Sequence, residues 1–196
     1  MSRGRPKKFN NDQALHDAML VFWRHGYRGT ALDDITAALN INKPSLYAAF
    51  GGKEELFLQV IDHYRAHILA PIAKPLSECN NLKDGLRQYF RDIAKIVMGK
   101  ETPPGCLVAC MLAEECCQTE SIKAKLAGAI AESDRFFCRV FEKHKDELNP
   151  QITPEAAAVL LVSTLHGLSI RARAGASQES IESGASAFLR VALKQP

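Results

Sequence analysis

Hydrophobic residues recur with helical spacing along almost the whole chain. Leu15, Ala18, Met19 and Phe22 stand at i, i+3, i+4 and i+7, which places them on one face of a helix. The alternation of apolar and polar residues that is typical of a strand is found nowhere in the sequence. We therefore predict an all-α fold, with helices over about residues 12–25, 31–39, 44–50, 53–70, 82–98, 106–117, 121–146, 153–174 and 178–194.

Local signals mark several ends of these helices. Asn11 or Asp12 is expected to cap the first helix, and Gly26 is expected to end it. Thr30 is expected to open the second, because Asp33 follows three positions later and approximates a capping box. Pro71 and Pro75 are expected to end the helix that begins near residue 53, since proline cannot donate to the helical ladder.

The second and third predicted helices are short and are separated by a four-residue break, which is the spacing of a helix-turn-helix. Asn40 tolerates the left-handed backbone that such a turn needs, and Pro44 suits a first helical position. Leu46 and Phe50 share one face and are expected to pack inward. The alternative is an ordinary corner in a helical core. The free face of the third helix carries Lys43, Ser45, Tyr47 and Ala48.

The composition is that of an ordinary globular protein. The chain has 196 residues, 46% of them hydrophobic and 24% charged. No apolar run approaches the roughly 18 residues of a membrane-spanning helix. The N-terminus is basic and lacks the apolar stretch of a secretory signal. We therefore expect a cytoplasmic protein with no membrane partner.

Positive charge is concentrated in the first quarter of the chain. Residues 1–53 hold eight Lys and Arg against four Asp, giving +4, whereas residues 54–196 hold 17 bases and 18 acids, giving −1. A basic end on a near-neutral body favours a polyanion partner for that end. The alternative is a tail that only improves solubility.

Four stretches together resemble the N-terminal signature of the TetR/AcrR family of bacterial transcriptional regulators. The resemblance covers about residues 10–60, and several spaced positions agree at once. Asn40, Thr36, Ala48 and Ala49 depart from the usual pattern, which leaves the base preference open. The matching stretches are Gly26-Tyr27-Arg28-Gly29-Thr30, Asp33-Asp34-Ile35, Asn42-Lys43-Pro44-Ser45-Leu46-Tyr47 and residues 50–57.

This resemblance implies a function and a division of the chain. Residues 1–55 would form a helix-turn-helix DNA-binding domain with a basic N-terminal arm, and residues 56–196 a helical ligand-binding and dimerisation domain. The protein would be a homodimeric repressor, not an enzyme, and would need no cofactor. It would be released from a palindromic operator in double-stranded DNA by a small effector.

The candidate DNA contacts lie in the first domain. Thr30 could offer its hydroxyl to a phosphate at a helix start. Tyr47 and Lys53 resemble the phosphate-contacting residues of the family. Lys43, Pro44 and Ser45 would lie nearest the base edges. The expected arm consists of Arg3, Arg5, Lys7 and Lys8, which could enter a minor groove or screen phosphates.

The candidate effector site consists of aromatic, sulfur-containing and imidazole side chains on the later helices. Such residues fit an apolar or aromatic effector, and the alternative for each is core packing. The candidates are Phe90, Phe137, Phe141 and His166, with Phe136, Met98 and Met111 as further members and with Cys106 and Cys110 added for their thiols.

Six cysteines are unusual for a chain of this kind, and disulfides are not expected in a reducing compartment. Cys106 and Cys110 lie four apart, and a helix N-terminus would lower the pKa of Cys106. This leaves a thiol-sensing or soft-metal-sensing regulator, and a thiol-dependent enzyme, as alternatives to core packing. His63 and His67 are also four apart, but we expect a solvent-facing pair and predict no metal site.

The last two predicted helices are expected to make the dimer. Residues 156–162 are apolar on all sides, which implies burial beyond one core. Small residues over 184–187 precede Phe188 and would let another helix approach closely. A four-helix bundle across a two-fold axis satisfies both features. The alternative is a fully buried helix in a monomer.

Overall fold

The computed structural model of this chain describes residues 10–99, 102–115 and 119–195, and it is all-α as predicted. Within that part of the chain no β-strand forms, and an isolated antiparallel bridge joins Leu148 to Leu193. None of its helices is both long enough and apolar enough to span a membrane. The helices are α1 (Asn11–Gly29), α2 (Leu32–Leu39), α3 (Lys43–Phe50), α4 (Lys53–Tyr64), α5 (Ala70–Glu78), α6 (Leu82–Val97), α7 (Leu107–Glu115), α8 (Glu120–Lys143), α9 (Pro154–Arg173) and α10 (Gln178–Ala192).

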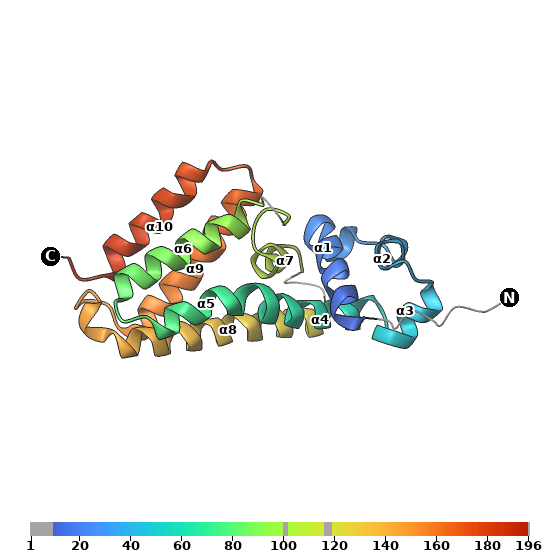
Figure 1. The fold of residues 1–196 in the computed structure, drawn as a ribbon, viewed down its shortest axis with the longest axis horizontal. Coiled ribbons are helices and arrows are strands. Elements are labelled where there is room, and N and C mark those ends of the chain that lie inside the picture. The colour runs from blue at the N-terminus through green and yellow to red at the C-terminus, as the bar shows by residue number, and fades with distance from the viewer. Residues whose placement is uncertain (1–9, 100–101, 116–118, 196) are drawn as a thin grey trace.

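The molecule is elongated, with two hydrophobic cores. Figure 1 shows α1, α2 and α3 grouped at one end and α6, α9 and α10 at the other, with α4 and α5 running between them. The first core joins α1–α4 to α7 and the start of α8. The second joins α5, α6, α9 and α10 to the remainder of α8. The first core includes residues well beyond residue 55, so it does not coincide with the predicted division into residues 1–55 and 56–196. That division stays a prediction.

Capping at the first two helices differs by one residue from the expected pattern. The side chain of Asn10, rather than Asn11 or Asp12, caps α1 and accepts from two backbone N–H groups. Gly26 does interrupt that helix, with a φ of 77° that a side chain would disfavour. At α2 the cap is Ala31, whose N–H donates to the Asp34 carboxylate at 2.8 Å.

The expectation that Pro71 and Pro75 end a helix is wrong. The helix that begins at Lys53 continues through a π turn over Arg65–Leu69 and then through α5 to Glu78. In the wide turn the Ala70 N–H reaches back to the Arg65 carbonyl. In a regular helix a proline leaves a preceding carbonyl without its N–H donor, and its ring clashes with that turn. A widened turn changes the hydrogen-bond pattern and makes room for the ring, so the helix continues through the prolines.

Candidate nucleic-acid interface and effector cavity

The turn between α2 and α3 has the geometry that the sequence predicted. Asn40 takes the left-handed conformation with φ 51° and ψ 46°. Its N–H donates to the Ala37 carbonyl at 3.2 Å, and the Ile41 N–H donates to the Thr36 carbonyl at 3.1 Å. These bonds satisfy the last carbonyls of α2, and Asn40 here takes the conformation that glycine most often takes at a helix end. The turn sets the direction in which α3 leaves α2.

One face of α3 is buried and the rest is open. The Asn42 side chain caps the helix and accepts from the Ser45 N–H at 2.9 Å. Leu46 and Phe50 are buried in the first core, and the other residues of α3 are exposed, with Tyr47 exposed to 52%. An eight-residue helix held by two side chains presents a narrow, convex surface that fits a major groove.

Two lysines frame this surface. Lys43 forms an ion pair with Asp33 at 2.6 Å, and both side chains are exposed. The hydrogen bond and charge of Asp33 raise the pKa of Lys43, so it carries its charge throughout the neutral range. Lys53 begins α4 and holds its ammonium 4.4 Å from the centre of the Tyr27 ring. Both cations lie at helix N-termini, where backbone N–H groups also favour anions.

The predicted role of the Thr30 hydroxyl is wrong. Thr30 is only 1% exposed, and its hydroxyl donates to the Gly26 carbonyl at 2.6 Å. The side chain is therefore committed to closing the break in α1 and cannot reach a phosphate. Arg3, Arg5, Lys7 and Lys8 lie outside the described residues.

A cavity of about 360 Å³ lies between the α4–α5 helix, α6, α8 and α9. Most of its wall surface is apolar, and polar side chains from the surrounding helices also line it. A charged pair, Arg65 with Glu132, spans α4–α5 and α8 at the cavity and links the two walls. The lining residues are Tyr64, Arg65, Leu69, Ala70, Ala73, Lys74, Ser77, Tyr89, Ile93, Ile96, Val97, Cys106, Glu132, Ser133, Phe136, Phe137, Val162, Leu165, His166 and Ser169.

The structure brings only some of the predicted effector residues to this cavity. Cys106, Phe137 and His166 line it, as does Phe136. Met98, with Phe90, instead borders a separate hollow between α6 and α10.

Phe90, Phe141, Cys110 and Met111 do not line this cavity, because each of them packs elsewhere. Phe90 packs its ring against Phe188 of α10 at 5.5 Å. Phe141 is fully buried in the second core, and Cys110 and Met111 are buried in the first core. Helical periodicity places a residue on an inward face, but it does not say which neighbouring helix that face meets.

The buried polar groups of the cavity are held in their neutral forms. The Tyr64 hydroxyl donates to Cys106 Sγ at 3.3 Å. Burial raises the pKa of Tyr64 and of Tyr89 above their ordinary value. Burial also lowers the pKa of His166, although Asp134 opposes this. Sequence reasoning missed both tyrosines, because their positions fit the core pattern of their helices and nothing marked them as facing a void.

The expected low pKa of Cys106 is also wrong. Burial raises it, and this effect outweighs the Tyr64 hydrogen bond and the nearby backbone N–H groups. Burial likewise raises the pKa of Cys110 despite the nearby Arg173 guanidinium. A helix N-terminus lowers a thiol pKa only when the thiolate remains solvated or paired.

His63 and His67 do not form the expected solvent-facing pair. His63 is buried, and its ring lies 4.3 Å from that of His67 and 6.1 Å from that of His16 on α1. Burial first, and then the neighbouring imidazoles, lower the pKa of His63. Among the described residues, no group of three His, Cys, Asp or Glu side chains is placed to hold a metal ion.

Arg173 connects the end of α9 to α1. At the end of α9 its guanidinium donates to the Trp23 carbonyl at 2.9 Å and to the Arg24 carbonyl at 3.4 Å, close to the break at Gly26. Ser169, one turn earlier on the same helix, lines the cavity. Arg173 and Ser169 therefore place α9 in contact with both α1 and the cavity.

Comparison with known proteins agrees with this arrangement. A family model described as "Bacterial regulatory proteins, tetR family" matches residues 14–60. The chain is 34% identical over 195 residues to the HTH-type transcriptional repressor ComR of Escherichia coli (strain K12), which covers 97% of this chain and 92% of that protein. It is 36% identical over 97 residues to the HTH-type transcriptional repressor BdcR of the same strain, covering 45% of this chain and 49% of that one.

Solved structures give the same result. A cysteine-substituted form of the TetR family transcriptional regulator CifR, complexed with 26-bp double-strand operator DNA, matches with a TM-score of 0.85 and 31% identity. The match covers 95% of this chain and 98% of that chain. The similarity therefore extends over both cores and is not confined to α1–α3.

Proposed function

The chain belongs to the TetR family of bacterial regulatory proteins, and on this premise we propose that it is a homodimeric repressor released from a palindromic operator by a small, uncharged, apolar or aromatic effector. As a member of this family it is a DNA-binding transcription regulator and not an enzyme. The observation that carries the proposal is the exposed face of α3, which is held from behind by only Leu46 and Phe50.

The DNA contacts that we propose follow from this face. Lys43, Pro44 and Ser45 stand at the exposed start of α3, where side chains reach base edges. Tyr47 lies further along the same helix and is proposed to contact a phosphate. Lys53, at the start of α4, is proposed to contact a phosphate from the neighbouring element. Lys43 must exchange Asp33 for DNA, which is a small cost for an exposed pair.

The effector chemistry follows from the cavity. Phe136, Phe137 and Leu165 contribute apolar walls, while His166 stays neutral and Arg65 is compensated by Glu132. The lining residue Lys74 is likewise paired, with Glu78 at 3.9 Å, so the cavity offers a charged effector no unpaired opposite charge and an uncharged molecule is favoured. The Tyr89 hydroxyl and His166 are available to orient one hydrogen-bonding group of that molecule.

The homodimer that we propose uses the outer faces of α9 and α10. Val159 and Ile170 on α9 are 54% and 50% exposed, and Val191 on α10 is 51% exposed. On α9 these residues share a stripe with Ala156, Leu160, Ser163 and Gly167, all exposed. Exposed apolar side chains repeating along one helix face are typical of a helix-bundle interface.

The burial of Cys106 and Cys110 argues against the alternative that the protein senses its effector through these two thiols. Cys106 lines the cavity, so an electrophilic effector would meet its sulfur, but burial raises its pKa and weakens it as a nucleophile. Cys110 does not reach the cavity. We therefore favour release by reversible binding over sensing through this pair.

The DNA part of the proposal is tested by binding to fragments selected from random double-stranded DNA and to the DNA upstream of the gene. We expect a salt-sensitive shift on a palindromic sequence at about 1 μM dimer or below. Tyr47→Ala should weaken binding to all sequences alike, because a phosphate contact carries no base information. Absence of any salt-sensitive complex would contradict the proposal.

The effector part is tested with two fluorescent probes that share one aromatic frame. N-Phenyl-1-naphthylamine is uncharged, and 8-anilinonaphthalene-1-sulfonate adds a sulfonate to it. We expect the uncharged probe to bind more tightly and Ala73→Trp, which fills the cavity wall, to weaken it by about tenfold or more. Tighter binding of the sulfonate would overturn the proposed effector class while leaving the DNA-binding proposal intact.

A further inference from the structure

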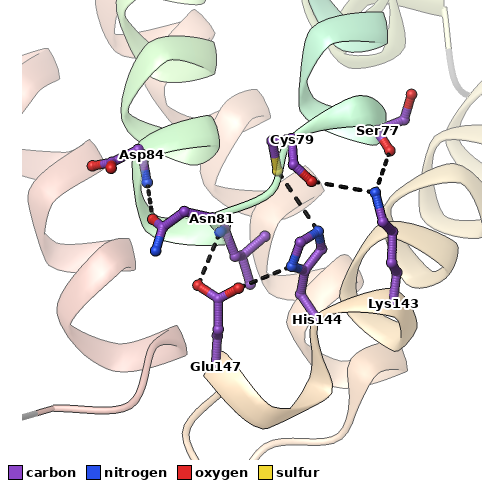
Figure 2. A network of polar contacts seen from close by, with 8 residues as sticks. Ser77, Cys79, Asn81, Asp84, Lys143, His144 and Glu147 are labelled. Carbon is purple, nitrogen blue, oxygen red and sulfur yellow. Dashed lines mark hydrogen bonds and ion pairs between the residues drawn. The ribbon is translucent and has the colours of Figure 1, made fainter.

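Figure 2 shows Cys79, His144 and Glu147 in a row, and none of the three lines the cavity. Cys79 Sγ is 3.7 Å from His144 Nε2, and His144 Nδ1 is 2.9 Å from Glu147 Oε1. A thiol, an imidazole and a carboxylate in this order form the arrangement in which a nucleophile is activated by an oriented base. Nothing in the proposed binding of DNA or effector uses these three side chains.

The ends of two helices that are distant in sequence bring the three residues together. Cys79 follows the last residue of α5, and His144 follows the last residue of α8, 65 positions later. Glu147 lies in the 3-10 turn after His144. Lys143 fastens the two ends, because its ammonium donates to the Ser77 carbonyl at 3.3 Å and to the Cys79 carbonyl at 3.2 Å.

The hydrogen bonds determine which ring nitrogen faces the thiol. Glu147 Oε2 accepts from the Leu82 N–H at 2.9 Å, which fixes the carboxylate at the start of α6. The other oxygen, Oε1, faces His144 Nδ1, so a neutral ring places its proton on Nδ1. Nε2 is then left as an acceptor and points at Cys79. His144 is only 8% exposed, so its ring is held in this orientation.

The thiol itself is half-buried and protonated at rest. Burial raises the pKa of Cys79, an effect that the positive charge of Lys143 opposes and the negative charge of Glu147 reinforces. A resting thiol gains reactivity from a base that removes its proton during bond formation. On its other side the sulfur lies against Gly85, where an added Cβ would come within 2.7 Å of Sγ. Because Gly85 has no side chain, the Cys79 sulfur has space to lie beside it and face His144.

We propose that Cys79 is a covalent modification site for soft carbon electrophiles of the α,β-unsaturated carbonyl class, with His144 as its base and Glu147 as the residue that positions His144. Among the described residues, the partners of the Cys106 and Cys110 sulfurs include Tyr64 and Arg173 but no imidazole. The proposal is independent of the proposed effector.

The reaction balances without an oxidant or a metal. The Cys79 sulfur bonds to the β-carbon of the electrophile while His144 Nε2 takes the thiol proton. The π electrons of the carbon–carbon double bond move toward the carbonyl, giving an enolate. The imidazolium, stabilised by the Glu147 carboxylate, then returns the proton to the α-carbon. The product is a thioether, and both His144 and Glu147 regain their starting states.

The experiment is alkylation of the full-length protein by a limiting amount of N-ethylmaleimide, followed by digestion and mass spectrometry of each cysteine. Cys138 is the internal control, because it is also half-buried and burial raises its pKa, but no described imidazole contacts its sulfur. A positioned base contributes about 100-fold or more, and the long contact to Cys79 reduces this, so we expect Cys79 to react at least about tenfold faster than Cys138.

Two variants separate a base from a structural role. His144→Gln should bring the Cys79 rate close to that of Cys138 without changing the Cys138 rate, and Glu147→Gln should lie between. In the wild type the Cys79 rate should depend less steeply on pH than the Cys138 rate, whereas in His144→Gln the two pH profiles should become parallel. Equal rates for Cys79 and Cys138 in the wild type, or a Cys79 rate and pH profile unchanged in both variants, would overturn the proposal. If His144→Gln loosens the fold, the Cys138 rate rises too, and Glu147→Gln then decides.

Discussion

The exposed face of α3 carries side chains that follow one another within a single eight-residue helix, whereas the cavity draws its walls from residues 64 to 169. The first surface is made by the residues that do not pack. The second is made by residues that pack incompletely against several helices at once. A local sequence motif can therefore specify the DNA-binding surface, while the cavity depends on how helices distant in sequence are placed.

The two regions are nevertheless joined. The helix that starts with Lys53 at the DNA-binding end continues to Tyr64 and Ser77 at the cavity. Arg173 makes a second connection from the cavity wall of α9 to the end of α1. Substitutions confined to one region can show how independent the two are.

The largest effect is expected for Leu46→Ala. Leu46 is fully buried and is one of two side chains that hold α3. Its truncation should lower the free energy of unfolding by about 3 kcal/mol and abolish DNA binding. Hydrogen exchange should show the loss of protection concentrated in α2 and α3, with α6, α9 and α10 retained. The control is Ala48→Ser on the exposed face. Equal loss of protection in both halves would show that the two cores unfold as one.

The next effect is expected for Lys43→Ala, measured as operator affinity. Removing a cation at the base edges should weaken binding by about tenfold or more and relax the preference at one base position. Folding should be unaffected, because the side chain is exposed and its pair with Asp33 is a surface pair. Lys83→Ala, which removes an exposed lysine from α6, is the charge-matched control. An equal loss in both variants would indicate a general charge effect.

A smaller effect is expected for Arg173→Gln, which removes the guanidinium that joins α9 to α1. Loss of its carbonyl contacts should lower the free energy of unfolding by about 1 kcal/mol. The more informative measurement is the coupling between N-phenyl-1-naphthylamine and DNA, which should weaken while each separate affinity changes little. Arg173→Lys should fall between, because an ammonium lacks the planar fork. Unchanged coupling would assign transmission to the α4–α5 helix alone.

The smallest effect is expected from pH. The folded state lowers the pKa of both His63 and His166 below the ordinary value of 6.5. The unfolded chain therefore binds protons more readily just below pH 6.5, and the free energy of unfolding should fall as pH decreases from 6.5 through the folded pKa values. Denaturant unfolding from pH 8 to pH 5 measures this. His63→Gln and His166→Gln should each remove part of the slope, one from each core. A stability that rises on acidification would contradict both assignments.

Much of the fold could be predicted from sequence, because helical periodicity and end signals are local. Asn40, Leu46 and Phe50 behave as predicted, since each role depends on neighbours within a few positions. Pro44 stands at the second helical position instead of the predicted first, because α3 begins at Lys43. The prediction for Pro71 and Pro75 failed because the helix continues through a π turn just before them. Packing of the helix against its neighbours stabilises that turn, which an isolated helix would not form. Thr30 failed for a related reason, since its hydroxyl closes a break whose shape the packing of α1 decides.

The sequence by itself determined the all-α class, the helix-turn-helix and the open face of α3, because those features depend on residue spacing and local backbone preference. Only the tertiary structure decided that His166 and Phe137 share a cavity with Tyr64 and Tyr89, and that Phe90 and Phe141 do not. It alone placed Cys79 beside His144. Burial, and with it the shifted pKa values of Cys79, Cys106, His63 and His166, depends on the helices that surround each residue. Contacts across 65 positions leave no local pattern in the chain.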